Sequence, residues 1–163
     1  MLRPYQTGAV EGLLEAHRGG KTPLCVMATG TGKTHVFVEY ARLARKRVMI
    51  IAERSEIVMQ AHQKVVSTGE TCDMEMGSAW SSEGMFSPKF VCASIQTLNA
   101  KFRYHRRMDR FDWTQFGLIV IDEAHHAVAK SYLRLLDTAR RKNPNIKVMG
   151  AVSYTHLTLP TKA

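Results

Sequence analysis

The 163-residue sequence predicts an α/β protein with a parallel sheet and helices on both faces. Short apolar runs of strand length alternate with amphipathic or polar stretches, at residues 24–28, 48–52, 90–93 and 118–121. After the first run, apolar residues recur at helical spacing: Val36, Phe37, Tyr40, Leu43 and Ala44. Ligands of such sheets bind beyond the carboxyl ends of the strands, so the residues that follow each run are candidate site residues.

The turn after the first run has the composition of a phosphate-binding loop. It consists of Thr29, Gly30, Thr31, Gly32, Lys33 and Thr34. Gly30 and Gly32 lack a Cβ, so the main chain can adopt positive φ and approach phosphate oxygens. Lys33 supplies a charge for the β- and γ-phosphates of ATP, and the Thr34 hydroxyl is a natural Mg²⁺ ligand. The full pattern G-x-x-x-x-G-K-[ST] would place glycine at Met27, and an ordinary glycine-rich turn is the alternative for the loop taken alone.

The apolar run at 118–121 ends in two adjacent carboxylates, Asp122 and Glu123. One carboxylate can hold Mg²⁺ while the other polarises a water molecule. We therefore expect Asp122 in the metal shell and Glu123 as the base that orients the attacking water. Because this pair and the glycine-rich loop both follow strand ends, they can converge on one nucleotide. Together they predict a site for ATP hydrolysis.

With these residues the chain resembles the superfamily 2 DEAD/DEAH-box helicases and translocases, in particular the group related to type III restriction subunits and UvrB. Five motifs in the family's order cover nearly all of residues 1–150. They are Leu2-Arg3-Pro4-Tyr5-Gln6, which is similar to the Q motif; Thr29–Thr34, similar to motif I, which tolerates a non-glycine at Met27; Val48–Gln60, similar to motif Ia; Val91–Leu98, similar to motif Ib; and Asp122-Glu123-Ala124-His125, the DEAH box of motif II. The resemblance implies the P-loop NTPase fold of a RecA-like domain.

The resemblance also implies roles for residues outside the phosphate loop. Gln6 would read the adenine edge of ATP, and His125 would link the state of the nucleotide to the nucleic acid. Arg54 and Thr97, within motifs Ia and Ib, would contact nucleic acid; a charge at the start of a surface helix is the alternative for Arg54. No role is implied for His126, and adjacent histidines lack the i, i+4 spacing of a zinc-binding helix.

The composition indicates one domain with an anionic partner. A chain of this length is near the size of a single domain with its own core. The formal charge of +9 and the pI near 9.7 favour an anionic partner such as nucleic acid. The family resemblance implies DNA in preference to RNA. No run approaches ~20 apolar residues, so no membrane span is expected. Cys25, Cys72 and Cys92 have neither CxxC spacing nor a metal cluster, as expected of a reduced, cytoplasmic protein.

The region between motifs Ia and II contains a basic segment with two interpretations. The segment includes Lys101, Arg103, His105, Arg106, Arg107 and Arg110. These side chains either contact nucleic acid or belong to a solvated loop. We expect Trp80 and Trp113 to be packing residues, because no aromatic pattern surrounds them. Residues 67–89, rich in Ser, Gly and Met, are expected to form a connection without chemistry of its own.

The end of the sequence departs from the family pattern. After Gly150 the family continues with motif III, roughly L-T-A-T-P, whereas residues 152–161 are VSYTHLTLPT. That run resembles a translation of the transposon-end adapter used in sequencing libraries. We therefore expect a helicase ATP-binding domain over residues 1–151, truncated before motif III, an artefactual tail over residues 152–163, and no second RecA-like domain.

The function implied by the resemblance is that of the ATP-binding half of an ATP-dependent DNA helicase or translocase, which couples ATP hydrolysis to movement on nucleic acid. Motors of this superfamily use a second RecA-like domain, and the arginine finger that it supplies is worth roughly 10³–10⁵ in rate in phosphoryl-transfer systems. The chain alone is therefore expected to have little or no activity. Two alternatives stay open: the motor subunit of a restriction or repair nuclease, and a module that binds ATP or nucleic acid without turnover.

Overall fold

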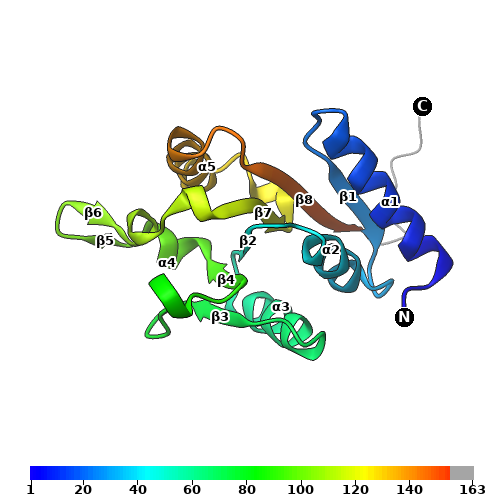
Figure 1. Ribbon diagram of the computed structural model, residues 1–163, viewed down its shortest axis with the longest axis horizontal. Helices are drawn as coiled ribbons and strands as arrows, with labels where there is room; N and C mark the ends of the chain where they lie inside the picture. The colour runs from blue at the N-terminus through cyan, green and yellow to red at the C-terminus, as the bar shows by residue number, and fades with distance from the viewer. Residues whose placement is uncertain (155–163) are drawn as a thin grey trace.

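The computed structural model describes residues 1–154 and contains a sheet of six parallel strands with helices on both faces (Figure 1). The helices are α1 (Pro4–Arg18), α2 (Lys33–Arg42), α3 (Ser55–Ser67), α4 (Ile95–Asn99) and α5 (Lys130–Lys142). The strands of the sheet are β1 (Leu24–Ala28), β2 (Arg47–Ala52), β3 (Cys72–Glu75), β4 (Phe90–Ser94), β7 (Phe116–Asp122) and β8 (Lys147–Tyr154). Their order is β1-β8-β7-β2-β4-β3, which confirms the predicted α/β fold.

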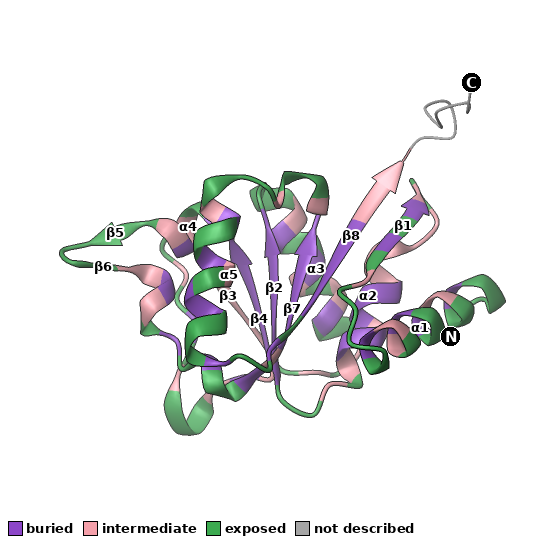
Figure 2. Cartoon of the chain, turned by 90° about the horizontal axis from the view of Figure 1, so that it is seen from above, coloured by how far each residue is buried: buried purple, intermediate pink, exposed green. Residues whose placement is uncertain are grey.

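Shorter elements connect these helices and strands. An antiparallel hairpin of β5 (Lys101–Phe102) and β6 (His105–Arg106) projects from the end of the molecule that carries α4 (Figure 2). The 3₁₀ helices are η1 (Gly84–Phe86), η2 (Arg107–Arg110), η3 (Trp113–Gln115) and η4 (Ala124–His126). No helix in the part of the chain from Met1 to Tyr154 has the length and apolar character needed to cross a membrane.

The central strands are apolar because both of their faces are covered. Along β2, Val48 and Ile50 point into the core beneath α1, α2 and α3, while Met49 and Ile51 point into the core beneath α4 and α5. All four side chains are buried, and the central strands are buried along their length in Figure 2. A parallel sheet covered on both faces favours such continuous apolar runs over strict alternation. The four runs predicted as strands accordingly form β1, β2, β4 and β7.

Two strands of the six-stranded sheet, β3 and β8, were not predicted. β3 lies at the edge of the sheet, within the segment expected to be a simple connection, and it ends at the fully buried Glu75. β8 lies between β1 and β7 and crosses the predicted domain boundary at residue 151. Residues 152–154 of the expected tail pair with residues 26–28 of β1 and so belong to the sheet. Residues 155–163, the remainder of that tail, lie outside the described residues.

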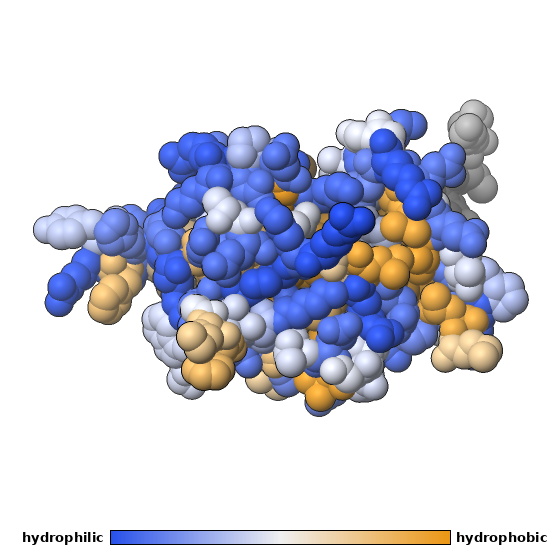
Figure 3. Space-filling view, in the orientation of Figure 1, coloured by the Kyte–Doolittle hydropathy of each residue, from blue (hydrophilic) through white to orange (hydrophobic). Residues whose placement is uncertain are grey.

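The face drawn in Figure 3 is mostly hydrophilic, with apolar side chains between the charged ones. The large exposed apolar residues include four in the region from β3 to β6: Trp80, Met85, Phe86 and Phe102. The aromatic ring of Tyr104, at the turn of the hairpin, is also exposed.

Candidate nucleotide-binding site

The predicted phosphate loop and the predicted acidic pair meet at the carboxyl edge of the sheet. The loop follows β1 and the acidic pair ends β7, and β8 lies between these strands. They enclose a cleft of about 440 Å³. It is lined by Gly30, Gly32, Lys33, Thr34, Ile57, Gln60, Asp122, Glu123 and Ser153. Ser153 was not predicted as a site residue because it falls in the expected tail, and nothing in the sequence singled out Ile57 or Gln60 within motif Ia.

The two loop glycines occupy backbone conformations that other residues avoid. Gly30 has φ of 82° and Gly32 has φ of 86°, both in the left-handed region. Gly32 is the N-cap of α2, so the first backbone N–H groups of that helix open towards the cleft. The glycine-rich loop therefore has the backbone conformation that a phosphate-binding loop requires.

Lys33 joins the two halves of the cleft. Its Nζ lies 2.6 Å from Asp122 Oδ1 and 2.7 Å from Glu123 Oε1. Burial alone would lower the pKa of Lys33, but the hydrogen bonds and charges of Asp122 and Glu123 outweigh burial and raise it. The lysine is therefore held fully charged at physiological pH, and the carboxylates form a pocket that attracts a cation.

Glu123 has a strained backbone. Its φ of 54° and ψ of 53° lie in the left-handed region, which is uncommon for a residue with a side chain. Its N–H donates to Asp122 Oδ1 at 2.9 Å, so the turn is fixed by the neighbouring carboxylate, which is itself buried. Strain of this kind costs of order 1–3 kcal/mol and collects at functional positions. The turn directs Glu123 back towards Lys33.

The start of α1 braces the phosphate loop. The buried Gln6 donates from Nε2 to the Thr31 carbonyl at 3.0 Å and accepts from the Arg3 N–H at 2.9 Å. Tyr5 donates its hydroxyl to the same Thr31 carbonyl at 2.9 Å. On the other side, the N–H and the hydroxyl of Thr29 both donate to the carbonyl of Tyr154. Gln6 thus contacts the loop directly, and its adenine contact stays a prediction.

The two histidines of motif II lie on the rim of the cleft and contact different acids. His125 Nδ1 is 3.5 Å from Glu123 Oε2, and His126 Nε2 is 3.5 Å from Glu53 Oε2. Both rings are largely exposed, and their centroids are 4.1 Å apart. His125 therefore touches the predicted base, as a residue that reports on the nucleotide would, and this role stays a prediction.

The two predicted nucleic-acid contacts follow neighbouring strands on the same edge of the sheet. Arg54 is exposed at the N-cap of α3, directly after β2, and Thr97 is partly exposed in α4, after β4. Thr97 Oγ1 accepts from the N–H of Gly77 at 3.1 Å. The structure places both residues beyond the strand ends, but the cleft of the phosphate loop does not include them.

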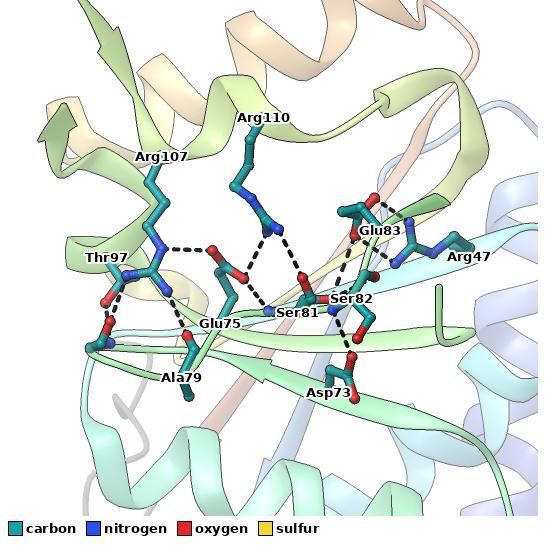
Figure 4. A network of polar contacts seen from close by, with 11 residues as sticks. Arg47, Asp73, Glu75, Ala79, Ser81, Ser82, Glu83, Thr97, Arg107 and Arg110 are labelled. Carbon is teal, nitrogen blue, oxygen red and sulfur yellow. Dashed lines mark hydrogen bonds and ion pairs between the residues drawn. The ribbon is translucent and has the colours of Figure 1, made fainter. Parts of the chain in front are cut away.

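The basic segment divides into two parts. Arg107 and Arg110 turn inwards and pair with the buried Glu75 (Figure 4). Lys101, Arg103 and His105 lie exposed on the hairpin. Residues 67–89 are therefore more than a simple connection, because Glu75 organises this network. That they carry no chemistry of their own stays a prediction. Trp113 is fully buried as predicted, whereas the prediction for Trp80 is wrong, because its side chain lies outside the core.

Comparison with known proteins agrees with the geometry of the site. Residues 1–149 match the family model of the type III restriction enzyme, res subunit. The irc3 protein of Schizosaccharomyces pombe, assigned as a mitochondrial ATP-dependent helicase, is 30% identical over 160 residues, and the match covers 91% of this chain and 25% of that protein. The chain therefore spans about a quarter of this curated relative.

Solved structures show the same fold. The UvsW helicase of bacteriophage T4 superposes with a TM-score of 0.66 at 21% identity, covering 93% of this chain and 51% of that one. A nuclease-deletion mutant of the type ISP restriction-modification enzyme LlaGI, in complex with a DNA substrate mimic, superposes with a TM-score of 0.65 at 16% identity, covering 93% of this chain and 17% of that one. Since the family model matches nearly the whole chain, the chain belongs to the family of the type III restriction enzyme res subunit, and its fold is the N-terminal RecA-like domain of a superfamily 2 helicase.

Proposed function

We propose that this domain is the ATP-binding half of an ATP-dependent DNA helicase or translocase. The observation that carries the proposal is the pair of contacts from Lys33 to Asp122 and Glu123. These two adjacent carboxylates lie 89 and 90 residues after Lys33 in the chain, so the contacts join two distant segments in one cleft. A lysine between a glycine-rich loop and two carboxylates is the arrangement that binds phosphates together with a divalent cation. The fold and the helicase relatives support the same function.

The residues of the cleft fit a nucleotide with Mg²⁺. The ammonium group of Lys33 already sits against the two carboxylates, so the donor set attracts positive charge. Thr34 and Asp122 are the residues that would hold Mg²⁺, and the bound ion would neutralise charge on the β- and γ-phosphates. Lys33 would then turn from the carboxylates to the phosphates. Its charge would thus be paired both in the absence and in the presence of the nucleotide.

Glu123 is the proposed base. With Asp122 committed to the metal, the second carboxylate is free to orient the attacking water and take its proton. In the structure Glu123 is bonded to Lys33 through Oε1 and lies near His125 through Oε2. Rearrangement of these two contacts on nucleotide binding would release the base and carry the change to the rim of the cleft.

The proposed partners are DNA and a second RecA-like domain. Arg54 and Thr97 are the proposed nucleic-acid contacts, and the LlaGI enzyme whose fold is shared was solved with a DNA substrate mimic. Gln6 is the proposed adenine contact, using the amide group that already braces the loop. The second RecA-like domain would supply the arginine finger, and a cytoplasmic location is part of the proposal.

A second candidate function is the motor subunit of a restriction nuclease. The match to the type III restriction res subunit and the likeness to LlaGI favour it. In that case movement on DNA would feed a separate nuclease site, and strand separation would be dispensable. A nuclease assay of the parent protein, alongside a strand-displacement assay, distinguishes the two functions. A module that holds ATP without turnover is the third alternative, and an ATPase assay with and without DNA tests it.

The nucleotide site itself is tested by calorimetric titration of the chain with ATP and Mg²⁺. We expect binding in the wild type and at least tenfold weaker binding in Lys33→Ala, because the variant lacks the phosphate-binding charge. Lys46→Ala, which removes an exposed lysine that bonds the Thr114 carbonyl, is the matched control. Equal affinities in wild type and Lys33→Ala would contradict the proposed site.

A further inference from the structure

A second hollow lies away from the nucleotide cleft, between the loop after β3 and the β5–β6 hairpin. Its volume is about 420 Å³. The side chains that matter for its chemistry are Trp80, Lys101, Phe102, His105, Arg106 and Arg107. Aromatic rings and cations thus share one wall, and neither the phosphate loop nor the DEAH box contributes to it.

Trp80 is held by two arginines and still leaves more than half of its surface exposed; the Arg110 guanidinium carbon lies 5.2 Å from the centre of its ring. The Arg107 guanidinium carbon lies 3.5 Å from the centre of the indole ring, yet the Trp80 side chain is 57% exposed. Arg107 is itself fixed, because it donates to Glu75 Oε1 at 2.6 Å, to the Gly77 carbonyl at 2.6 Å and to the Ala79 carbonyl (Figure 4). An arginine with this many partners is a rigid base for the ring, and the cation–π contact adds to it.

Glu75 explains why the arginine is fixed. Its side chain is fully buried and accepts from Arg107, from Arg110 at 3.0 Å and from the Ser81 N–H at 2.6 Å. A buried carboxylate needs such partners, since an unpaired charge in the interior is costly. Two arginines share this one carboxylate, so the wall of the hollow keeps excess positive charge.

Lys101, Phe102 and His105 of the hairpin line the hollow, and Arg103 and Tyr104 lie beside them at the hairpin turn. Phe102 is 70% exposed and Tyr104 is 97% exposed, and they alternate with Lys101, Arg103 and His105 along the hairpin. Exposed rings do not contribute to packing in the core, but every nucleic-acid base has a face that can stack on them. Cations beside the rings neutralise the phosphates that accompany the bases.

The loop that carries Trp80 is also hydrogen-bonded to one of the predicted nucleic-acid contacts. Gly77, in the loop that carries Trp80, donates its N–H to Thr97 Oγ1 at 3.1 Å. The same loop is bound to η2, because Arg107 donates to the carbonyls of Gly77 and Ala79 and Arg110 donates to the carbonyl of Ser81. Thr97 and the Trp80 ring are therefore parts of one connected unit, as Figure 4 shows for the polar contacts.

We propose that Trp80 and Phe102 form a base-stacking surface for single-stranded nucleic acid, with Lys101 and Arg103 neutralising its phosphates. The inference rests on the proposed function as a nucleic-acid motor and extends its contacts beyond Arg54 and Thr97. A duplex hides the faces of its bases, so the surface favours a single strand over a duplex of equal length. Stacking is tolerant of sequence, because each base presents a similar face.

The two tryptophans make a direct test possible. Trp113 is fully buried and Trp80 is exposed, so a base stacked on the surface quenches only Trp80. Titration of the whole chain with oligothymidylate should quench part of the tryptophan emission, and Trp80→Phe should abolish that quench. Oligouridylate in a parallel titration distinguishes RNA from DNA as the preferred strand. A quench that persists in Trp80→Phe would overturn the proposal.

Affinity supplies the second readout. By fluorescence anisotropy of a labelled oligothymidylate, Trp80→Ala and Phe102→Ala should each weaken binding about tenfold. Phe86→Ala removes an equally exposed ring outside the hollow and should bind like the wild type. If both test variants bind the oligothymidylate with affinities within twofold of the wild type, the proposed stacking surface is contradicted.

Titration of the same proteins with ATP separates this inference from the proposed function. If the chain binds ATP but its binding of oligonucleotide does not depend on Trp80, the proposed stacking surface is contradicted and the proposed nucleotide site is supported. Trp80-dependent binding of oligonucleotide without ATP binding supports the surface and contradicts the nucleotide site.

Discussion

Gln6 lies so close to Gly32 that a Cβ at residue 32 would collide with the side-chain amide nitrogen of Gln6. Gly30, two residues earlier, has almost the same φ but open space where a Cβ would be. Positive φ in a residue with a side chain costs of order 1–3 kcal/mol. We expect Gly30→Ala to lose about that much free energy of unfolding, and Gly32→Ala to lose more and to weaken ATP binding. Urea unfolding compares the two, and equal losses would show that Gln6 yields to the added methyl group.

Glu123→Gln should separate ATP binding from hydrolysis. The amide keeps the shape of the side chain but cannot accept a proton, and a general base typically contributes about 10²–10⁴ in rate. In a protein that joins this domain to the proposed second RecA-like domain, we expect turnover to fall by that factor while ATP affinity stays within about threefold. A steady-state ATPase assay with DNA measures the turnover. If Glu123→Gln hydrolysed ATP at nearly the wild-type rate, Glu123 could not be the general base.

Glu75→Ala should be among the most destabilising substitutions on the β3 edge. It leaves Arg107 without its carboxylate partner and removes a buried charged network, and breaking a buried pair costs roughly 3–5 kcal/mol. Asp73→Ala is the matched control on the same strand, because Asp73 accepts a hydrogen bond from Ser82 near the surface. There we expect a loss of about 1 kcal/mol. Chemical denaturation gives both values, and a small loss in Glu75→Ala would show that the arginines find other partners.

The free energy of unfolding should fall as the solution becomes acidic. Burial, and then the charge of Lys147, lower the pKa of His17 below its ordinary value of 6.5, although the Val148 carbonyl opposes them. Burial and the charge of Lys64 also lower the pKa of His35. A histidine with a lowered pKa in the folded state stabilises the protein above about pH 6.5, and this stability is lost as pH falls through the folded-state pKa.

The His17→Gln variant tests this pH dependence. Between about pH 7.5 and about pH 5, its free energy of unfolding should change less than that of the wild type, and His35 accounts for the remainder. His105→Gln replaces an exposed histidine on the hairpin and should follow the wild-type curve. Parallel curves for wild type and His17→Gln would mean that His17 binds its proton equally in both states.

The phosphate loop and the acidic pair of the cleft could be predicted from the sequence because each of them is a short contiguous segment, whereas Ile57, Gln60 and Ser153 could not. The phosphate loop is contiguous, and the acidic pair ends an apolar run that is recognisable without knowledge of the fold. The Glu75 network is different, since its partners are 32 and 35 residues apart in the chain. β3 has no continuous apolar run, and so neither the strand nor its buried glutamate could be found by periodicity.

The same contrast explains the error at Trp80 and the unpredicted length of β8, whereas the domain boundary at residue 151 stays a prediction. No pattern around Trp80 shows that an arginine 27 residues later covers one face of its ring. Residues 152–154 were assigned to a foreign tail by their likeness to an adapter, yet they have the strand propensity needed to pair with β1. Strand pairing depends on backbone hydrogen bonds, which any residue except proline can make.

The pairing of β1 with β8 has a consequence for the order in which the protein folds. Among the described residues, the hydrogen-bonded neighbour of the first strand is the last one, about 125 residues later in the chain. Synthesis proceeds from the N-terminus at about 5–20 residues per second, so β1 waits several seconds for its partner to leave the ribosome. During that time β2, β4 and β7 can already assemble, since all three precede β8. We therefore expect the phosphate loop to be the last part of the cleft to become ordered, and protease digestion of ribosome-bound chains of increasing length would show its protection only once Tyr154 has emerged.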